Sequence, residues 1–149
     1  MRAVIQRVSQ ASVQVDGTFR ASTGPGLLVY LGVGRDDGEP DIAFLTDKIR
    51  HLRIFSDEAG RLNLDVMQAR GQVLVVSAFT VQADARHGRR PSFDDAAEQD
   101  RAFVLYQLFC DALAKTGVPV SQGVFGGYMQ VHAVNDGPIC ILLESRKAF

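Results

Sequence analysis

Hydrophobic and polar residues alternate along the first part of the chain, as they do in β-strands. The alternation runs from Val4 to Val8 and again from Val13 to Val15, and Asp16-Gly17 then provides a hairpin signal. A second apolar run, Leu27 to Val33, has the character of a buried strand. Residues 1 to 34 are therefore predicted to form a meander of strands.

Two later segments have the spacing of amphipathic helices. Proline is suited to the first turn of a helix, and the first segment is predicted to run from Pro40 to about His51. Its apolar residues recur at helical intervals: Ile42, Leu45, Ile49 and Leu52. Gly60 and Asn63 then indicate a loop.

The second helix is predicted to begin at Asp94 or Asp95, because aspartate is favoured at helix starts. It is expected to continue to about Thr116, where Gly117 ends it. Its apolar stripe is expected to consist of Ala97, Val104, Leu108 and Ala112, broadened by Phe109 and Leu113.

Strands are predicted again in the middle and at the end of the chain. The runs concerned are Val73 to Val81, Val118 to Val120, Tyr128 to Val134 and Ile139 to Leu143. Strands gather at both ends of the chain and only two helices are predicted. The predicted fold class is therefore α+β, with a mostly antiparallel, barrel-like sheet rather than a doubly wound parallel one.

The sequence Asn135-Asp136-Gly137-Pro138 lies between the last two predicted strands. Asparagine, aspartate and glycine are common turn residues, so an ordinary hairpin turn is one interpretation. The other is a rigid corner that binds a ligand through its backbone carbonyls, because glycine and proline place little side chain in the way.

Composition and charge narrow the class of protein. The 149 residues, of which 46% are hydrophobic, fit one globular domain. Cys110 and Cys140 have no disulfide-framework spacing, which favours reduced thiols and a cytoplasmic location. No apolar run approaches the roughly 20 residues that a bilayer requires, so no membrane association is expected. The net charge of -1 argues against a broad nonspecific nucleic-acid binder, but it allows a local basic cluster.

Common catalytic and metal-binding motifs are missing from the sequence. None of the three histidines, His51, His87 and His132, has a carboxylate or nucleophile at a recognisable spacing. Paired-cysteine and H-E-x-x-H motifs are absent, so no metal is expected. Gly32-Val33-Gly34 lacks the lysine or third glycine of nucleotide-binding motifs and is interpreted as a turn.

A basic loop is one candidate binding element. Arg86, Arg89 and Arg90 surround Gly88. Guanidinium groups bind phosphate oxygens bidentately, and glycine lets a backbone approach closely. A solvated loop that balances nearby carboxylates is the ordinary interpretation of the same residues.

Two further segments are candidates for a pocket. Thr80 comes near the end of an apolar strand, where its hydroxyl and the neighbouring backbone N–H groups could face a ligand. Phe125 and Met129 lie among glycines close to the Asn135-to-Pro138 segment. In most proteins a strand threonine is structural, and such apolar side chains belong to the core.

Together these segments resemble the D-aminoacyl-tRNA deacylase family over essentially the whole chain. The matching segments are Met1 to Val8, Gly24 to Leu28, Leu52 to Phe55, Gly88 to Phe93 and Asn135 to Pro138. The resemblance implies a single deacylase domain over residues 1–149, in a homodimer of α+β subunits. Its expected activity is hydrolysis of the ester between a D-amino acid and tRNA, as proofreading in translation. Partial acceptance of glycyl-tRNA is expected too, and the resemblance implies no metal or other cofactor.

The resemblance also implies site residues. The family's Ser-Gln-Phe-Thr motif corresponds to a catalytic segment that comprises Ser77, Ala78, Phe79 and Thr80. Gly137 and Pro138 correspond to a Gly-Pro element that is held cis and offered from the opposite subunit, where it excludes L-amino acids. Arg7 corresponds to the arginine that braces this element. Phe125 and Met129 correspond to residues at the end of an adenosine pocket, and the arginines of the basic loop would contact tRNA phosphates.

Several positions depart from the family pattern. Ala78 stands where the motif has glutamine, Cys140 where threonine is usual, and Gly127-Tyr128 where Ala-Asp is usual. The missing glutamine leaves open a non-catalytic module that binds RNA ends. A deacylase that acts on a small L-aminoacyl-tRNA is the second alternative, expected if the bond between Gly137 and Pro138 is trans. Within the deacylase hypothesis, either Thr80 or the substrate's own 2′-hydroxyl activates the attack.

Overall fold

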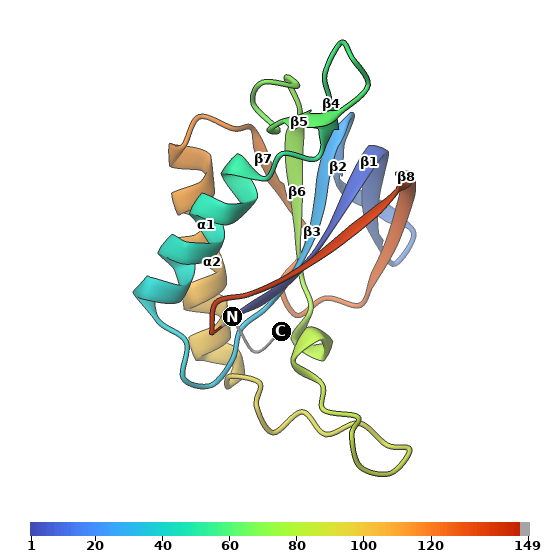
Figure 1. Cartoon of the computed structure of the whole chain (residues 1–149). Helices are drawn as coiled ribbons and strands as arrows, with labels where there is room; N and C mark the ends of the chain where they lie inside the picture. Colours follow the sequence, from blue (N-terminus) through green and yellow to red (C-terminus); the bar gives the residue numbers. More distant parts are fainter. Residues whose placement is uncertain (147–149) are drawn as a thin grey trace.

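The computed structural model describes residues 1–146, in which two helices pack against one face of a curled sheet (Figure 1). The helices are α1 (Glu39–His51), α2 (Gln99–Lys115) and the short 3-10 helix η1 (Phe79–Gln82). The strands are β1 (Arg2–Val15), β2 (Thr18–Thr23), β3 (Gly26–Gly32), β4 (Phe55–Ser56), β5 (Leu62–Leu64), β6 (Gln72–Ser77), β7 (Val120–Gln122) and β8 (Met129–Glu144).

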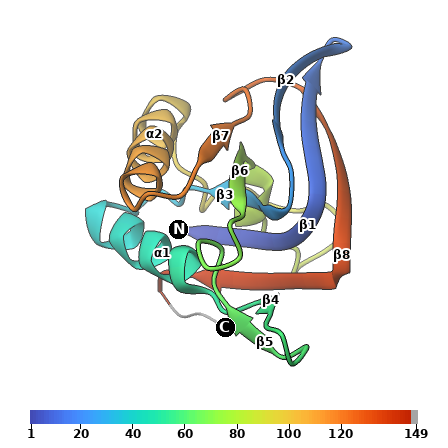
Figure 2. The same cartoon turned by 90° about the horizontal axis from the view of Figure 1, so that it is seen from above.

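The main sheet is mixed, with strand order β2-β1-β3-β6-β7 and β8 paired along the outer side of β1. Strand β1 is antiparallel to β2, β3 and β8, as predicted for most of the sheet. The pairs β3·β6 and β6·β7 are parallel instead, and the prediction missed them. A helix lies between the two strands of each parallel pair, as parallel connections require. Figure 2 shows β1 and β8 bending together, so that the sheet curls toward a barrel.

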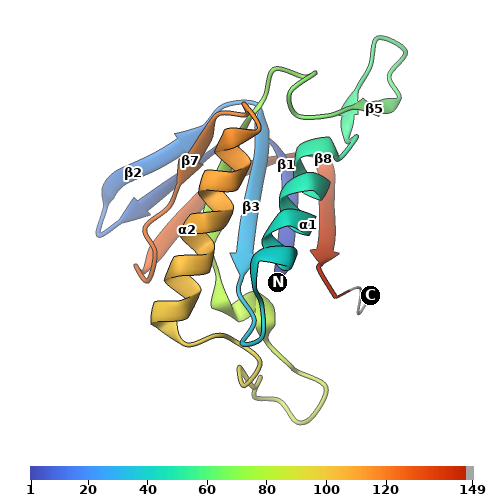
Figure 3. The same cartoon turned by 90° about the vertical axis from the view of Figure 1, so that its left-hand side faces the viewer.

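The helices bury one face of the sheet, and the curl buries part of the other. Figure 3 shows α1 and α2 in front of the sheet, with β3 visible between them. Leu27 and Val29 of β3 pack in the cluster that contains the helices, whereas Leu28 packs with Leu74 in a second cluster behind the sheet. All three side chains have no exposed surface. Burial on both faces explains why this strand is a continuous apolar run.

Local signals predicted α1 and two turns correctly. Helix α1 ends at His51 as predicted, has proline in its first turn, and buries Ile42, Leu45 and Ile49. Asp16 and Gly17 both have positive φ, as the predicted hairpin turn requires. Gly117 also has positive φ, at the end of α2.

The prediction for α2 was wrong at the start of the helix and for two residues of its apolar stripe. The helix begins at Gln99, because the backbone N–H of Ala97 donates to the carbonyl of Val33, beyond the end of β3. The expected stripe is contradicted by Val104 and Leu108, which are 55% and 44% exposed. Phe109 and Leu113 are buried as predicted, and the helix also buries Leu105, Tyr106 and Cys110.

Four other boundaries differ from the prediction, and one is that of β7, which starts at Val120 instead of ending there. The small antiparallel pair β4·β5 occupies the segment expected to be a loop. Strand β6 ends at Ser77, and the chain then turns into η1. The two predicted C-terminal strands are one strand, β8.

None of the helices in residues 1–146 is long and apolar enough to cross a bilayer.

Candidate active site

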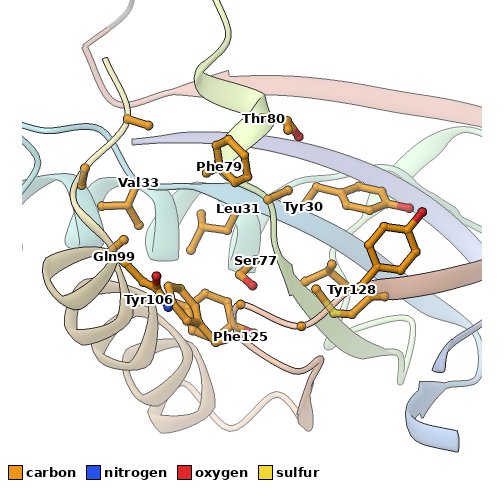
Figure 4. Close-up of a pocket in the computed structure, with 18 of the residues that line it drawn as sticks. Tyr30, Leu31, Val33, Ser77, Phe79, Thr80, Gln99, Tyr106, Phe125 and Tyr128 are labelled. Carbon is orange, nitrogen blue, oxygen red and sulfur yellow. The ribbon is translucent and has the colours of Figure 1, made fainter. Parts of the chain in front are cut away.

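A cavity of about 680 Å³ opens between the start of α2, the ends of β3 and β6, η1 and the segment that leads into β8 (Figure 4). Its lining brings together six residues predicted for the site from two distant segments: Ser77, Ala78, Phe79, Thr80, Phe125 and Met129. In Figure 4 Ser77 lies in the middle, with Phe79 and Thr80 on one side and Phe125 on the other. The structure thus unites the two segments in one pocket.

The pocket is electrically neutral. No charged residue in the described part of the chain lines it. Burial raises the pKa of Tyr30, and burial together with the nearby Cys110 thiol raises that of Tyr106. The hydroxyl of Tyr106 donates to the carbonyl of Val75 at 3.0 Å. The pocket therefore suits the uncharged parts of a ligand, and phosphate groups would have to lie outside it.

The segment from Ser77 to Thr80 is a turn rather than the end of a long strand. The backbone N–H of Ala78 donates to the carbonyl of Leu31 at 2.9 Å, which holds the turn against β3. The N–H groups of Phe79 and Thr80 open the 3-10 helix, so no acceptor within that helix is available to them. Both side chains are exposed, and the ring of Phe79 contacts Phe93 edge-on at 5.1 Å. This geometry leaves two backbone donors beside the pocket.

A buried glutamine that the sequence reasoning missed fixes this turn. Gln82 is 4% exposed, and its side-chain amide donates to the carbonyl of Gly32 at 2.6 Å. A Cβ atom at Gly32 would lie 3.0 Å from the carbonyl oxygen of Ala78, so the turn and β3 are in close contact. Nothing local in the sequence distinguishes Gln82 from an exposed loop residue, because its partner is far away along the chain.

The opposite wall of the pocket is aromatic. The ring of Phe125 contacts Tyr106 at 5.5 Å and Phe103 at 5.2 Å between ring centroids. Met129 packs under the preceding loop, since a Cβ atom at Gly123 would lie 2.9 Å from its sulfur. Tyr128 lies between Phe125 and Met129 in the sequence, and its side chain is 88% exposed. No role for this residue was predicted from the sequence.

Residues 136–139 form a bulge, which contradicts the interpretation as a hairpin turn. Gln6 of β1 is opposite Cys140 and Val8 is opposite Asn135, so four residues of β8 stand across from Arg7 alone. The side-chain oxygen of Asn135 accepts the backbone N–H of Ile139 at 3.0 Å. The peptide bond between Gly137 and Pro138 is cis, as the resemblance implied. Both residues are exposed and lie outside the pocket lining of their own chain.

Arg7 is positioned to brace this bulge. Its guanidinium donates to the carbonyl of Asp136 at 3.1 Å and to that of Ile54 at 2.8 Å. The carboxylate of Asp136 lies 3.3 Å from the same group. The contacts tie the bulge to the segment after α1.

The three arginines of the basic loop differ in their surroundings. Arg86 forms an ion pair with Asp84 at 2.6 Å, and its hydrogen bonds hold the pKa of Asp84 well below the usual range. Arg89 and Arg90 are exposed and have no ion-pair partner within residues 1–146. They are therefore available to an external anion.

No cluster of metal-ligating side chains is found among the described residues.

Comparison with known proteins assigns the family. A family model described as D-Tyr-tRNA(Tyr) deacylase matches residues 4–144. The D-aminoacyl-tRNA deacylase of Anaeromyxobacter dehalogenans is 54% identical over 149 residues, which cover 100% of both chains. That of Syntrophobacter fumaroxidans is 52% identical over the same length and coverage.

Solved structures have the same fold. A structure of a "c-Myc DNA Unwinding Element Binding Protein" superposes with a TM-score of 0.92 at 39% identity, covering 97% of this chain and 98% of that one. A structure described as a "probable eukaryotic D-amino acid tRNA deacylase" gives a TM-score of 0.79 at 16% identity, covering 96% and 98%, which is a likeness of fold alone. From the family match over most of its length and from its full-length relatives, the chain belongs to the D-Tyr-tRNA(Tyr) deacylase family.

Proposed function

We propose that this protein hydrolyses the ester bond of D-aminoacyl-tRNA, releasing the free amino acid and the tRNA as proofreading in translation. One observation carries the proposal: the segment Ser77 to Thr80 and the pair Phe125 and Met129 line one neutral pocket, in a chain with full-length relatives named as such deacylases. Apart from its ammonium group, an aminoacyl group on a terminal nucleoside is uncharged, which matches this lining. We propose that glycyl-tRNA is a partial substrate. Glycine has no side chain, so a site that excludes L side chains by steric clash does not exclude glycine.

The proposed chemistry needs little acid–base machinery. The vicinal 2′-hydroxyl of ribose already activates the ester, so positioning and stabilisation of the oxyanion are the main tasks left to the protein. The backbone N–H groups of Phe79 and Thr80 are the proposed oxyanion donors. The hydroxyl of Thr80 orients the carbonyl or the attacking water, while Ser77 and Ala78 line the floor beneath. No metal takes part in this scheme, and a chelator is expected to leave the rate unchanged.

The proposed active form is a homodimer. A substrate ammonium needs oxygen acceptors, and the neutral pocket supplies no carboxylate within the described residues. The exposed bulge with Gly137 and Pro138 lies on β8, a long strand whose one strand partner within residues 1–146 is β1. An edge of this kind can pack against a second copy. The bulge of one subunit would then enter the pocket of the other, where its carbonyls bind the ammonium and its backbone excludes an L side chain.

The tRNA body is proposed to lie against the basic loop. Arg89 and Arg90, which have no ion-pair partner within residues 1–146, lie in the loop that follows η1, and η1 carries Thr80. Arg86 contributes less, because Asp84 already engages it. The proposed location of this reaction is the cytoplasm, where translation supplies the substrate.

Turnover of matched D-tyrosyl-tRNA and L-tyrosyl-tRNA by the purified protein, with and without a chelator, tests the activity. Rapid release from the D substrate alone is the expected result. Faster release from the L substrate would favour the alternative selectivity. Tight binding without turnover would favour the RNA-end-binding module.

Complementation between two variants that are each expected to be impaired tests the shared site. Thr80→Val damages the pocket and leaves the bulge intact. Gly137→Val damages the bulge, because φ at this glycine is +135° and an added Cβ would lie 2.9 Å from the Ile139 side chain. After subunit exchange, an equal mixture is expected to regain about a quarter of the wild-type rate, since about half of the dimers are mixed and each has one intact site. A mixture as inactive as its components would contradict the shared site.

A further inference from the structure

We propose that Tyr128 is a stacking platform for the base of the nucleotide that precedes the 3′-terminal adenosine of the tRNA. This inference rests on the proposed function and extends it to a second nucleotide. It gives a role to a residue that departs from the family pattern at the edge of the pocket.

Tyr128 is unusual among the aromatic residues of the described chain. It is the most exposed of its large hydrophobic side chains, at 88%, although part of it lines the pocket. Within residues 1–146, no hydrogen bond or ring contact involves its side chain. Figure 4 shows the ring at the edge of the pocket that lies opposite Gln99 and α2. An aromatic face is therefore presented to solvent at the entrance.

The neighbours of Tyr128 are held in place, so the platform has a fixed base. Phe125 packs between Tyr106 and Phe103, and Met129 packs against Gly123. Under the proposed function, these two residues contact the terminal adenosine inside the pocket. Tyr128 lies between them in sequence but is directed outward, where the next nucleotide of the RNA leaves the pocket.

The chemistry of the entrance matches a nucleobase better than a phosphate. The pocket lining is uncharged, so the backbone phosphates of the RNA lie outside it. The 3′ end of tRNA is unpaired, and unpaired bases are commonly recognised by stacking on exposed tyrosine or phenylalanine rings. Such stacking tolerates any base, so 2-aminopurine can take the place of the native base in a binding test.

Fluorescence of a short RNA tests the contact directly. The probe is an oligoribonucleotide with a CCA-like 3′ end, 2-aminopurine in the penultimate position, and D-tyrosine joined to the terminal ribose by a non-hydrolysable amide. Binding to the wild type is expected to quench the penultimate 2-aminopurine. Tyr128→Ala is expected to remove the quenching and to raise Kd about tenfold, whereas Tyr128→Phe retains both. Phe19→Ala, which removes an exposed aromatic ring outside the pocket lining, is the matched control and is expected to change neither.

Kinetics separate this contact from a structural role. Tyr128→Ala is expected to raise KM for D-tyrosyl-tRNA about tenfold at unchanged kcat, and to leave KM for D-tyrosyl-adenosine unaltered. An equal rise for both substrates would place the terminal base on Tyr128 and overturn the proposal. Unchanged quenching and KM in Tyr128→Ala would overturn it as well.

Sedimentation distinguishes RNA binding from subunit contact. If the loss of RNA affinity in Tyr128→Ala disappears at protein concentrations where the variant is fully dimeric, Tyr128 serves the dimer and the proposal is wrong. The fluorescence measurement needs no turnover, so the two proposals fail separately. A wild type that quenches the probe through Tyr128 but hydrolyses nothing overturns the proposed function and supports this inference. A wild type that hydrolyses D-tyrosyl-tRNA without any effect of Tyr128→Ala does the reverse.

Discussion

The side-chain oxygen of Asn135 accepts the backbone N–H of Ile139, 3.0 Å away across the bulge that carries Gly137 and Pro138. The amide nitrogen of Asn135 donates to the sulfur of Cys140 at 3.1 Å. The residue before the bulge is therefore tied by its side chain to the residues at the end of the bulge. Together with the guanidinium of Arg7 on the Asp136 carbonyl, it fixes a loop whose proposed place is the pocket of a second subunit.

Replacement of Asn135 separates the two contacts. Asn135→Ala is expected to lower the free energy of unfolding by about 1 kcal/mol, because the Ile139 N–H loses its acceptor. It is also expected to lower kcat/KM for D-tyrosyl-tRNA. Asn135→Asp keeps the acceptor and loses only the weak contact to sulfur, so it should remain closer to the wild type in both measurements. Equal losses in the two variants, by urea unfolding and by kinetics, would contradict this assignment.

The arginines of the basic loop are expected to make the affinity for tRNA depend on salt concentration. Arg89→Gln and Arg90→Gln should each raise KM for D-aminoacyl-tRNA and reduce the slope of log Kobs against log salt by about one unit per lost phosphate contact. Arg86→Gln should have a smaller effect, because Asp84 already pairs with this guanidinium. Binding measured over a series of salt concentrations checks the slopes. Unchanged slopes with a lower melting temperature would identify the arginines as parts of a structural loop.

How far the fold follows from sequence depends on how local each signal is. Helix α1 could be predicted from Pro40 and from the spacing of Ile42, Leu45 and Ile49, because residues within one segment determine both its start and its buried face. The start of α2 failed because the backbone of Ala97 is bonded to Val33, far away along the chain. Periodicity could not reveal that bond, and the predicted stripe then included Val104, which is exposed.

The site shows the same limit. The residue types of the Ser77-to-Thr80 segment and of the Gly137-Pro138 pair could be recognised, but their geometry could not. Asn135 to Pro138 has the composition of a turn, and only its pairing across from Arg7 makes it a bulge within one strand. The burial of Gln82 could not be predicted for the same reason, since its side-chain amide donates to a carbonyl on β3.

Acid stability is expected to depend on Asp65, near the end of α1. Burial by itself would raise the pKa of its carboxyl. Hydrogen bonds from the Gln68 backbone and from Arg50, 2.8 Å away, outweigh burial and hold the pKa below its usual range. The folded-state pKa is thus below the unfolded one, so this stabilisation is present above the unfolded-state pKa of about 4 and is lost as pH falls through the folded value.

The variant Asp65→Asn tests this linkage. It is expected to be less stable than the wild type at neutral pH, and the difference should shrink as pH falls into the range where the wild-type carboxyl is protonated. Urea unfolding at a series of pH values measures both curves. Parallel curves for the two proteins would show that Asp65 does not contribute to the acid sensitivity.

Ala78 and Thr80 decide how much of the chemistry the side chains perform. If the backbone N–H groups of Phe79 and Thr80 are the main oxyanion donors, Ala78→Gln should change kcat by much less than the ~100-fold associated with the loss of such a donor. Thr80→Val should lower kcat more, because it preserves shape and removes only the hydroxyl. Both are measured on D-tyrosyl-tRNA under single-turnover conditions, which exclude product release.

The kinetics of Ala78→Gln and Thr80→Val distinguish between the possible mechanisms. A wild type that is inert until Ala78→Gln restores the amide would show that the amide is essential and that this chain binds without catalysing. An unimpaired Thr80→Val variant would remove the hydroxyl from the mechanism. The 2′-hydroxyl of the substrate would then be the activating group, and a substrate with 2′-deoxyribose at its terminal nucleotide, which lacks that group, should be hydrolysed far more slowly by the same variant.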